Sequence, residues 1–105
     1  MSREHFKTIT KHLKHGVYVE TTPHGTTTYT PVQQDLITTE KGDLNPSSPV
    51  QIGVYVLAYP ERLEPLVARV KDFRQTNYLP RFQLDGLPNW LGKTRIKAIV
   101  TFKAF

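Results

Sequence analysis

Residues 93–105, KTRIKAIVTFKAF, alternate in character along the chain and predict a β-strand that runs to Phe105. One face of this strand is apolar, and we assign it to the core: Ile96, Ala98, Val100, Phe102 and Ala104. The other face places cations beside Ile99 and Phe105. A solvent-facing strand does not need Phe105, whereas a contact with another subunit would use it.

Two further elements precede this strand near the start of the chain. Residues 2–16 predict a helix, because Phe6, Ile9 and Leu13 fall on one stripe and Gly16 supplies a stop. Residues 17–32 predict a β-hairpin that turns at residues 23–25. Pro31 lacks a backbone N–H, so the second strand of the hairpin lies at a sheet edge or ends there.

Residues 33–49, QQDLITTEKGDLNPSSP, are rich in turn formers and predict a flexible loop or a contact arm. Residues 50–60, VQIGVYVLAYP, predict a central strand whose two faces are both largely apolar. Residues 61–77 predict a second helix, because apolar side chains recur at helical spacing along it: Leu63, Leu66, Val67, Val70 and Phe73. Residues 81–84 predict a short strand.

The chain has 105 residues, which favours one domain, 1–105. The order of predicted elements is helix, hairpin, loop, strand, helix and two strands. This order predicts an α+β fold in which two helices pack on a mostly antiparallel sheet.

Composition excludes several classes of function. The chain has no cysteine, so disulfides, thiolate zinc sites and thiol catalysis are excluded, and a reducing compartment such as the cytoplasm is favoured. The first 16 residues are charged throughout and lack the apolar core of a secretory signal. No apolar run approaches the roughly 18 residues that a membrane helix needs, so no membrane is expected as a partner.

The residues give little support for catalysis or metal binding. His12 and His15 could share a helix face and bind a metal if a third ligand arrived, but cations at a helix end explain them better. His24 falls in a turn, where a general base has neither a pocket nor a held partner. The carboxylates form no catalytic or metal-binding motif. We therefore assign no catalytic, cofactor-binding or metal-binding residue and expect no cofactor.

The net charge of +5 leaves both nucleic acid and an acidic protein surface open as partners. Residues 51–105 carry nine positive and four negative side chains. Basic residues there, with tyrosines between them, could form a surface for single-stranded nucleic acid: Arg69, Arg74, Arg81, Lys93, Arg95, Lys97 and Lys103 with Tyr55, Tyr59 and Tyr78. A small basic nucleic-acid-binding module is therefore the alternative function, although the cations form no dense cluster.

At the level of element order the chain resembles the small tail-terminator and tail-completion (neck) proteins of long-tailed bacteriophages. The resemblance lies in the N-terminal helix, the hairpin and loop, the segment PVQIGVYVLAYPERLEPLVARVKDF and the closing strand IKAIVTFKAF. It implies an α+β subunit that forms a homo-oligomeric ring on the tail tube and meets the head connector, with a basic face that either meets an acidic partner or passes near DNA. It implies location in the virion after assembly in the host cytoplasm, and no catalytic residues.

Under this resemblance, an exposed strand and a loop aromatic are expected to contact a neighbouring subunit. Trp90 either plugs the edge of the core or anchors a partner. The predicted interface comprises Trp90, Arg95, Lys97, Lys103 and Phe105.

Overall fold

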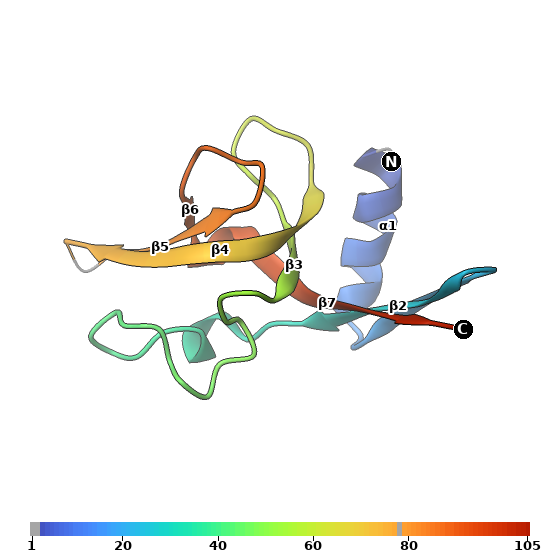
Figure 1. Cartoon of the computed structure of the whole chain (residues 1–105), viewed down its shortest axis with the longest axis horizontal. Helices are drawn as coiled ribbons and strands as arrows, with labels where there is room; N and C mark the ends of the chain where they lie inside the picture. The colour runs from blue at the N-terminus through green and yellow to red at the C-terminus, as the bar shows by residue number, and fades with distance from the viewer. Residues whose placement is uncertain (1–2, 78) are drawn as a thin grey trace.

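The computed structural model describes residues 3–77 and 79–105 (Figure 1). In that part of the chain one α-helix accompanies seven strands. The elements are α1 (Arg3–Leu13), β1 (Tyr18–Thr22), β2 (Gly25–Pro31), η1 (Gln34–Leu36), β3 (Tyr55–Ala58), β4 (Leu66–Thr76), β5 (Leu79–Leu84), β6 (Leu91–Gly92), η2 (Lys93–Arg95) and β7 (Ile96–Ala104). The predicted α+β class is confirmed, and the prediction of two packed helices is wrong.

The strand predicted at the end of the chain, β7, lies inside the sheet. The seven strands follow the order β1-β2-β7-β3-β4-β5-β6, and every pair is antiparallel. β7 joins the β1–β2 hairpin on one side to β3 on the other, and the sheet then curls over through β4 and β5 (Figure 1). Because β2 ends at Pro31, the missing N–H of that proline interrupts no further pairing.

A bulge in β7 changes which side chains reach the core. Ala58 pairs with Ile96 and Leu57 pairs with Ala98, so Lys97 is an extra residue on β7. The bulge places Ile96 and Ile99 in one core cluster, and Ala98 with Val100 in the other. The predicted single apolar face is therefore wrong, because Ile99 is buried while Phe102 and Ala104 are exposed.

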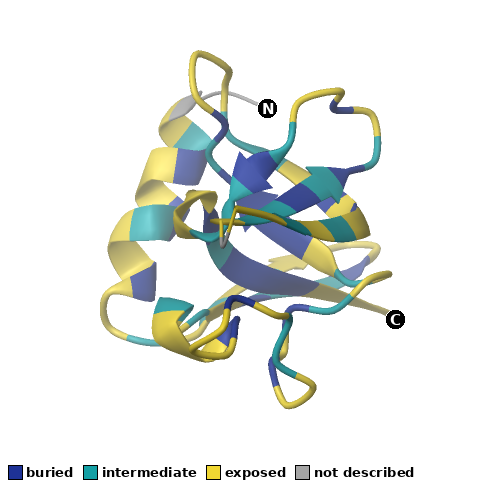
Figure 2. Cartoon of the chain, turned by 90° about the vertical axis from the view of Figure 1, so that its left-hand side faces the viewer, coloured by how far each residue is buried: buried dark blue, intermediate teal, exposed yellow. Residues whose placement is uncertain are grey.

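Two hydrophobic clusters lie on opposite faces of the sheet. The larger cluster fills the inside of the curl and includes Phe82, Leu84 and Val70. The smaller cluster lies under α1, whose Phe6, Ile9 and Leu13 side chains are buried. Figure 2 shows buried strands at the centre of the fold and the exposed outer side of α1. The predicted apolar stripe of the first helix is confirmed.

Residues 66–76 form a strand where the sequence predicted a helix. Leu66 and Val70 project to the inner face together with Ala68, in the alternating pattern of a strand. A register shift between Val70 and Asp72 then brings Phe73 to the same inner face. Two alternating steps separate Leu66 from Val70 by four residues, and the bulge separates Val70 from Phe73 by three. Spacings of four and three are those that predict a helix. Cross-strand pairing with β3 and β5 satisfies the backbone instead.

The predicted strand at 50–60 is shorter in the structure. Only Tyr55–Ala58 form β3, because residues 51–54 turn at Gly53, whose φ is +97°. Val50 is buried but Ile52 is exposed, so these two residues do not share a core face. The predicted strand at 81–84 is part of β5.

Residues 33–49 lie against the body of the protein. Ile37 is fully buried in the larger cluster, with Leu44 packed against it. A bridge pairs Thr38 with Leu44, and Thr38 Oγ1 accepts a hydrogen bond of 2.9 Å from Lys93 Nζ. The segment therefore contributes apolar side chains to the core.

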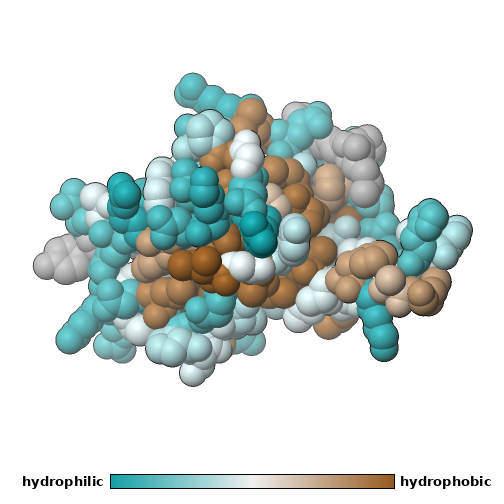
Figure 3. Space-filling view, viewed as in Figure 1, coloured by the Kyte–Doolittle hydropathy of each residue, from teal (hydrophilic) through white to brown (hydrophobic). Residues whose placement is uncertain are grey.

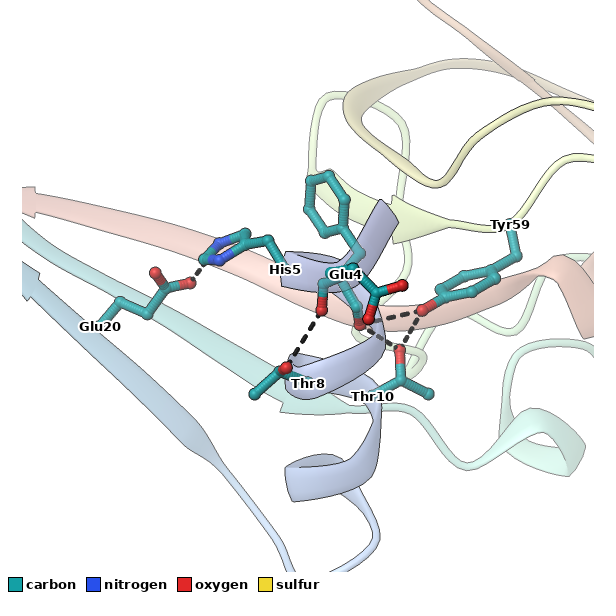
Figure 4. Close-up of polar contacts among 7 residues, drawn as sticks. Glu4, His5, Thr8, Thr10, Glu20 and Tyr59 are labelled. Atoms are coloured by element: carbon teal, nitrogen blue, oxygen red, sulfur yellow. Dashed lines mark hydrogen bonds and ion pairs between the residues drawn. The ribbon is translucent and has the colours of Figure 1, made fainter. Parts of the chain in front are cut away.

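Polar contacts fix α1 to the sheet as well (Figure 4). The Tyr59 hydroxyl donates to the Phe6 carbonyl oxygen at 3.0 Å and contacts the Thr10 hydroxyl. On the other side of the helix, His5 Nε2 lies 3.1 Å from Glu20 Oε1 on β1. These contacts, together with the buried stripe, set the position of α1 over β2 and β7.

Candidate functional site

An aromatic groove forms where α1 leaves one face of the sheet uncovered. Val100 on β7 pairs with Tyr29 on β2 and with Tyr55 on β3, so these three side chains form a row on the face that carries α1. Thr27 and Phe102 form the next row outward. The 11-residue helix is about 16 Å long at 1.5 Å per residue. It buries Tyr29 but leaves Tyr55 and Phe102 exposed.

The groove has a volume of about 670 Å³ and an apolar lining. Phe6 of α1 flanks one side, and the segment 65–67 at the start of β4 flanks the other. The exposed fraction is 53% for Tyr55, 59% for Phe102 and 36% for Val67. The full lining comprises Phe6, Thr27, Tyr29, Tyr55, Pro65, Leu66, Val67, Val100 and Phe102. The polar side chains of the lining are Thr27, Tyr29 and Tyr55.

Beyond the groove, the outer ends of β1, β2 and β7 project past α1 as an arm (Figure 1). Phe105 extends this arm, because its N–H donates to the carbonyl oxygen of His24 at 3.3 Å. Its side chain is 79% exposed. Figure 3 shows apolar side chains gathered over the outer end of β7 beside the C-terminus. The arm thus presents an apolar surface to solvent next to the groove.

Tyr29, at the floor of the groove, is held in its neutral form. Burial, together with the charge of the nearby Glu20 carboxylate and a hydrogen bond to it, raises the pKa of Tyr29 to about 12. Because Glu20 also pairs with His5, it links α1, β1 and β2 beneath the helix. The arrangement holds the helix on the arm, and the tyrosine does not ionise near neutral pH.

A second hollow, the arginine pocket, lies at the opposite end of β7. Its volume is about 650 Å³. It is lined by Pro60, Glu61, Arg62, Arg81, Asn89, Trp90, Leu91, Gly92, Thr94 and Arg95. Trp90 is half-buried, and the Arg74 guanidinium carbon lies 4.8 Å from the centre of its ring. Trp90 is thus both packed against the sheet and open to the pocket.

The five predicted interface residues fall into separate places. Trp90 and Arg95 meet in the arginine pocket. Lys97 lies at the bulge and donates to the Thr94 carbonyl oxygen at 2.9 Å. Lys103 and Phe105 are exposed on the arm. Trp90 and Arg95 therefore lie together, apart from the other three predicted interface residues.

The predicted basic surface with interleaved tyrosines is dispersed in the structure. Arg69 forms an ion pair of 2.9 Å with Asp85, and Lys93 binds Thr38. The Tyr59 hydroxyl donates to the backbone of α1. Tyr78 lies outside the described residues. Only Arg74, Arg81 and Arg95 gather around Trp90, joined there by Arg62, which the sequence did not single out.

The histidines offer no metal site in the described residues, where no group of three or more His, Asp or Glu side chains could hold a metal ion. His12 stacks on Tyr18 with ring centres 4.8 Å apart. His24 is exposed in the turn between β1 and β2. Over residues 3–77 and 79–105, no helix has the length and apolar character needed to cross a membrane.

Comparison of the chain with protein-family models, curated proteins and solved structures gives no match.

Proposed function

We propose that this chain is a non-enzymatic assembly subunit whose copies join head to tail. In this proposal Phe105 and the arm of one copy enter the aromatic groove of the next copy. The observation that carries the proposal is the groove itself, which exposes Tyr55, Phe102 and Val67 on an otherwise packed sheet face. Exposed apolar surface of this kind is typical of sites of protein contact.

The geometry favours a second copy over self-contact. Phe105 is held in extended backbone by its bond to His24, and only three residues, or about 10 Å, separate it from Phe102 in the groove wall. The arm therefore points Phe105 away from the groove of its own chain. Groove and arm are different surfaces, so a contact between them is heterologous and generates a ring where the rotation closes.

The narrower proposal places this subunit in a phage tail. There it would form a homo-oligomeric ring in the neck of the virion, between the tail tube and the head connector. This context rests on the resemblance in element order. One element of that order, the helix at 61–77, is the strand β4 in the structure, so the context rests on the remaining elements.

Sedimentation velocity over a range of protein concentrations tests the assembly proposal. We expect wild-type protein to form discrete oligomers, and Phe105→Ser and Val67→Arg each to remain monomeric. Ile52→Ser is the matched control, because Ile52 is 57% exposed but lies outside the groove. We expect Ile52→Ser to assemble like the wild type.

Mixing the two variants separates head-to-tail contact from other geometries. Phe105→Ser keeps an intact groove and Val67→Arg keeps an intact arm, so an equimolar mixture should give a dimer that grows no further. A wild-type monomer at all concentrations contradicts the assembly proposal. Equal loss of assembly in Ile52→Ser contradicts the assigned surface, and an unrescued mixture contradicts the head-to-tail geometry.

A further inference from the structure

Three arginines from separate segments meet in the arginine pocket. Arg62 comes from the turn between β3 and β4, Arg81 from β5 and Arg95 from η2. Glu61 is the one carboxylate in the lining, and its Oε2 lies 4.0 Å from Arg95 Nη2. Both side chains of that pair are exposed, so water screens it. The side chains that line the pocket therefore carry a net charge of +2.

The positive groups of the pocket are held in place beside an indole. Arg81 Nη1 donates to the Pro80 carbonyl oxygen at 3.0 Å, which orients its guanidinium. Arg74 packs on Trp90 but does not line the pocket, so it supports the ring without filling the hollow. Arg62 has a φ of 66°, a backbone conformation that residues other than glycine seldom adopt. Strained residues of this kind are concentrated at binding sites.

We propose that the arginine pocket binds single-stranded nucleic acid. Guanidinium groups bind phosphate oxygens with two parallel hydrogen bonds, and an indole stacks on any base. An acidic peptide would form ion pairs with the arginines but would leave the ring of Trp90 without a stacking partner. The volume of about 650 Å³ is within the range of ligand pockets. The pocket shares no lining residue with the aromatic groove, so binding here does not depend on self-association.

The single tryptophan of the chain reports on this site directly, because it is Trp90. We would titrate the protein with an oligothymidylate of about ten nucleotides and follow the fluorescence of Trp90. We expect saturable quenching that weakens with salt. Three phosphate contacts predict a slope of about −2 in a plot of log affinity against log salt concentration.

Arg95→Gln is the first variant, since Arg95 is exposed and its loss should leave the fold intact. We expect it to reduce the steepness of the salt slope by about 0.7. Lys71→Gln is the matched control, because Lys71 is exposed in the same basic half of the chain but lies outside the pocket. Trp90→Leu, measured by anisotropy of a labelled oligothymidylate, should lose about tenfold or more in affinity.

Several outcomes would overturn the proposal. Absence of quenching would do so, as would equal loss of affinity in Arg95→Gln and Lys71→Gln. Unchanged affinity of Trp90→Leu for the oligothymidylate would show that no base stacks on Trp90. Tighter binding of a polyglutamate peptide than of the oligothymidylate would assign the pocket to an acidic protein instead. Circular dichroism of each variant confirms that the fold is intact before binding is compared.

Discussion

Two phenylalanines on strands of the same sheet should lose different amounts of stability on the same substitution. Phe82 on β5 is fully buried, and its ring centre lies 5.0 Å from that of Phe73. Replacement by alanine leaves a cavity in the larger cluster, so we expect Phe82→Ala to lower the free energy of unfolding by about 3–5 kcal/mol. Domains of this size have total stabilities of about 5–15 kcal/mol, so this loss is severe.

Phe102 on β7 is 59% exposed, so about two fifths of its surface is buried. Full burial of a phenylalanine side chain contributes about 1.5–3 kcal/mol, so Phe102→Ala should cost about 1 kcal/mol in the monomer. Its larger effect should be on self-association, because Phe102 lines the aromatic groove. The same substitution thus separates a residue that stabilises the fold from one that mediates contact.

Urea denaturation followed by circular dichroism measures both changes. The protein concentration must be low enough to keep the wild type monomeric, because assembly would itself add apparent stability. The reasoning fails if Phe102→Ala costs as much as Phe82→Ala, since Phe102 would then belong to the core. It fails equally if Phe82→Ala leaves the unfolding midpoint unchanged.

Three further predictions concern the packing of the helix and the arm. Burial raises the pKa of Tyr29 to about 12 in the folded state, above an unfolded value of about 10. The free energy of unfolding should therefore fall as pH rises from 10 to 12. Urea midpoints measured across this range should fall less steeply for Tyr29→Phe than for the wild type. A Cβ on Gly25 would lie 2.4 Å from the Lys103 carbonyl oxygen, so Gly25→Ala should cost about 1–3 kcal/mol in the same assay. Gly92→Ala should cost less, because a Cβ there would lie 3.4 Å from Nη1 of the flexible Arg81 side chain. Ile9→Ala should cost about 2–5 kcal/mol, because Ile9 is fully buried beneath α1; a loss below about 0.5 kcal/mol would show that α1 does not depend on this contact.

Local patterns predicted those elements whose spacing is unbroken. The stripe of Phe6, Ile9 and Leu13 identified α1, and the turn at 23–25 identified the β1–β2 hairpin. β4 was missed because a bulge after Val70 changes the phase of an alternating pattern, and the resulting spacing matches a helix. A second bulge, at Lys97, made the assignment of faces in β7 wrong for the same reason. Bulges depend on the partner strand, which a single segment does not reveal.

The candidate sites were harder to predict than the elements. Trp90 and Arg95 stood out as an isolated aromatic and a strand cation, but their neighbours Arg62 and Arg81 come from other parts of the chain. Only the curl of the sheet brings these segments together. The aromatic groove depends on the length of α1 relative to the sheet face, and that comparison needs the topology.

The position of β7 has a consequence for how the protein is made. The ribosome releases residues 96–104 after every other strand, yet this strand alone joins the β1–β2 hairpin to β3. Until residues 96–104 are synthesised, the edges of β2 and β3 that pair with β7 lack their partner strand. Such edges bind foreign strands readily, so nascent chains paused before residue 96 should be prone to aggregation. Completion of the fold requires contacts between residues far apart in the chain, which favours slow folding.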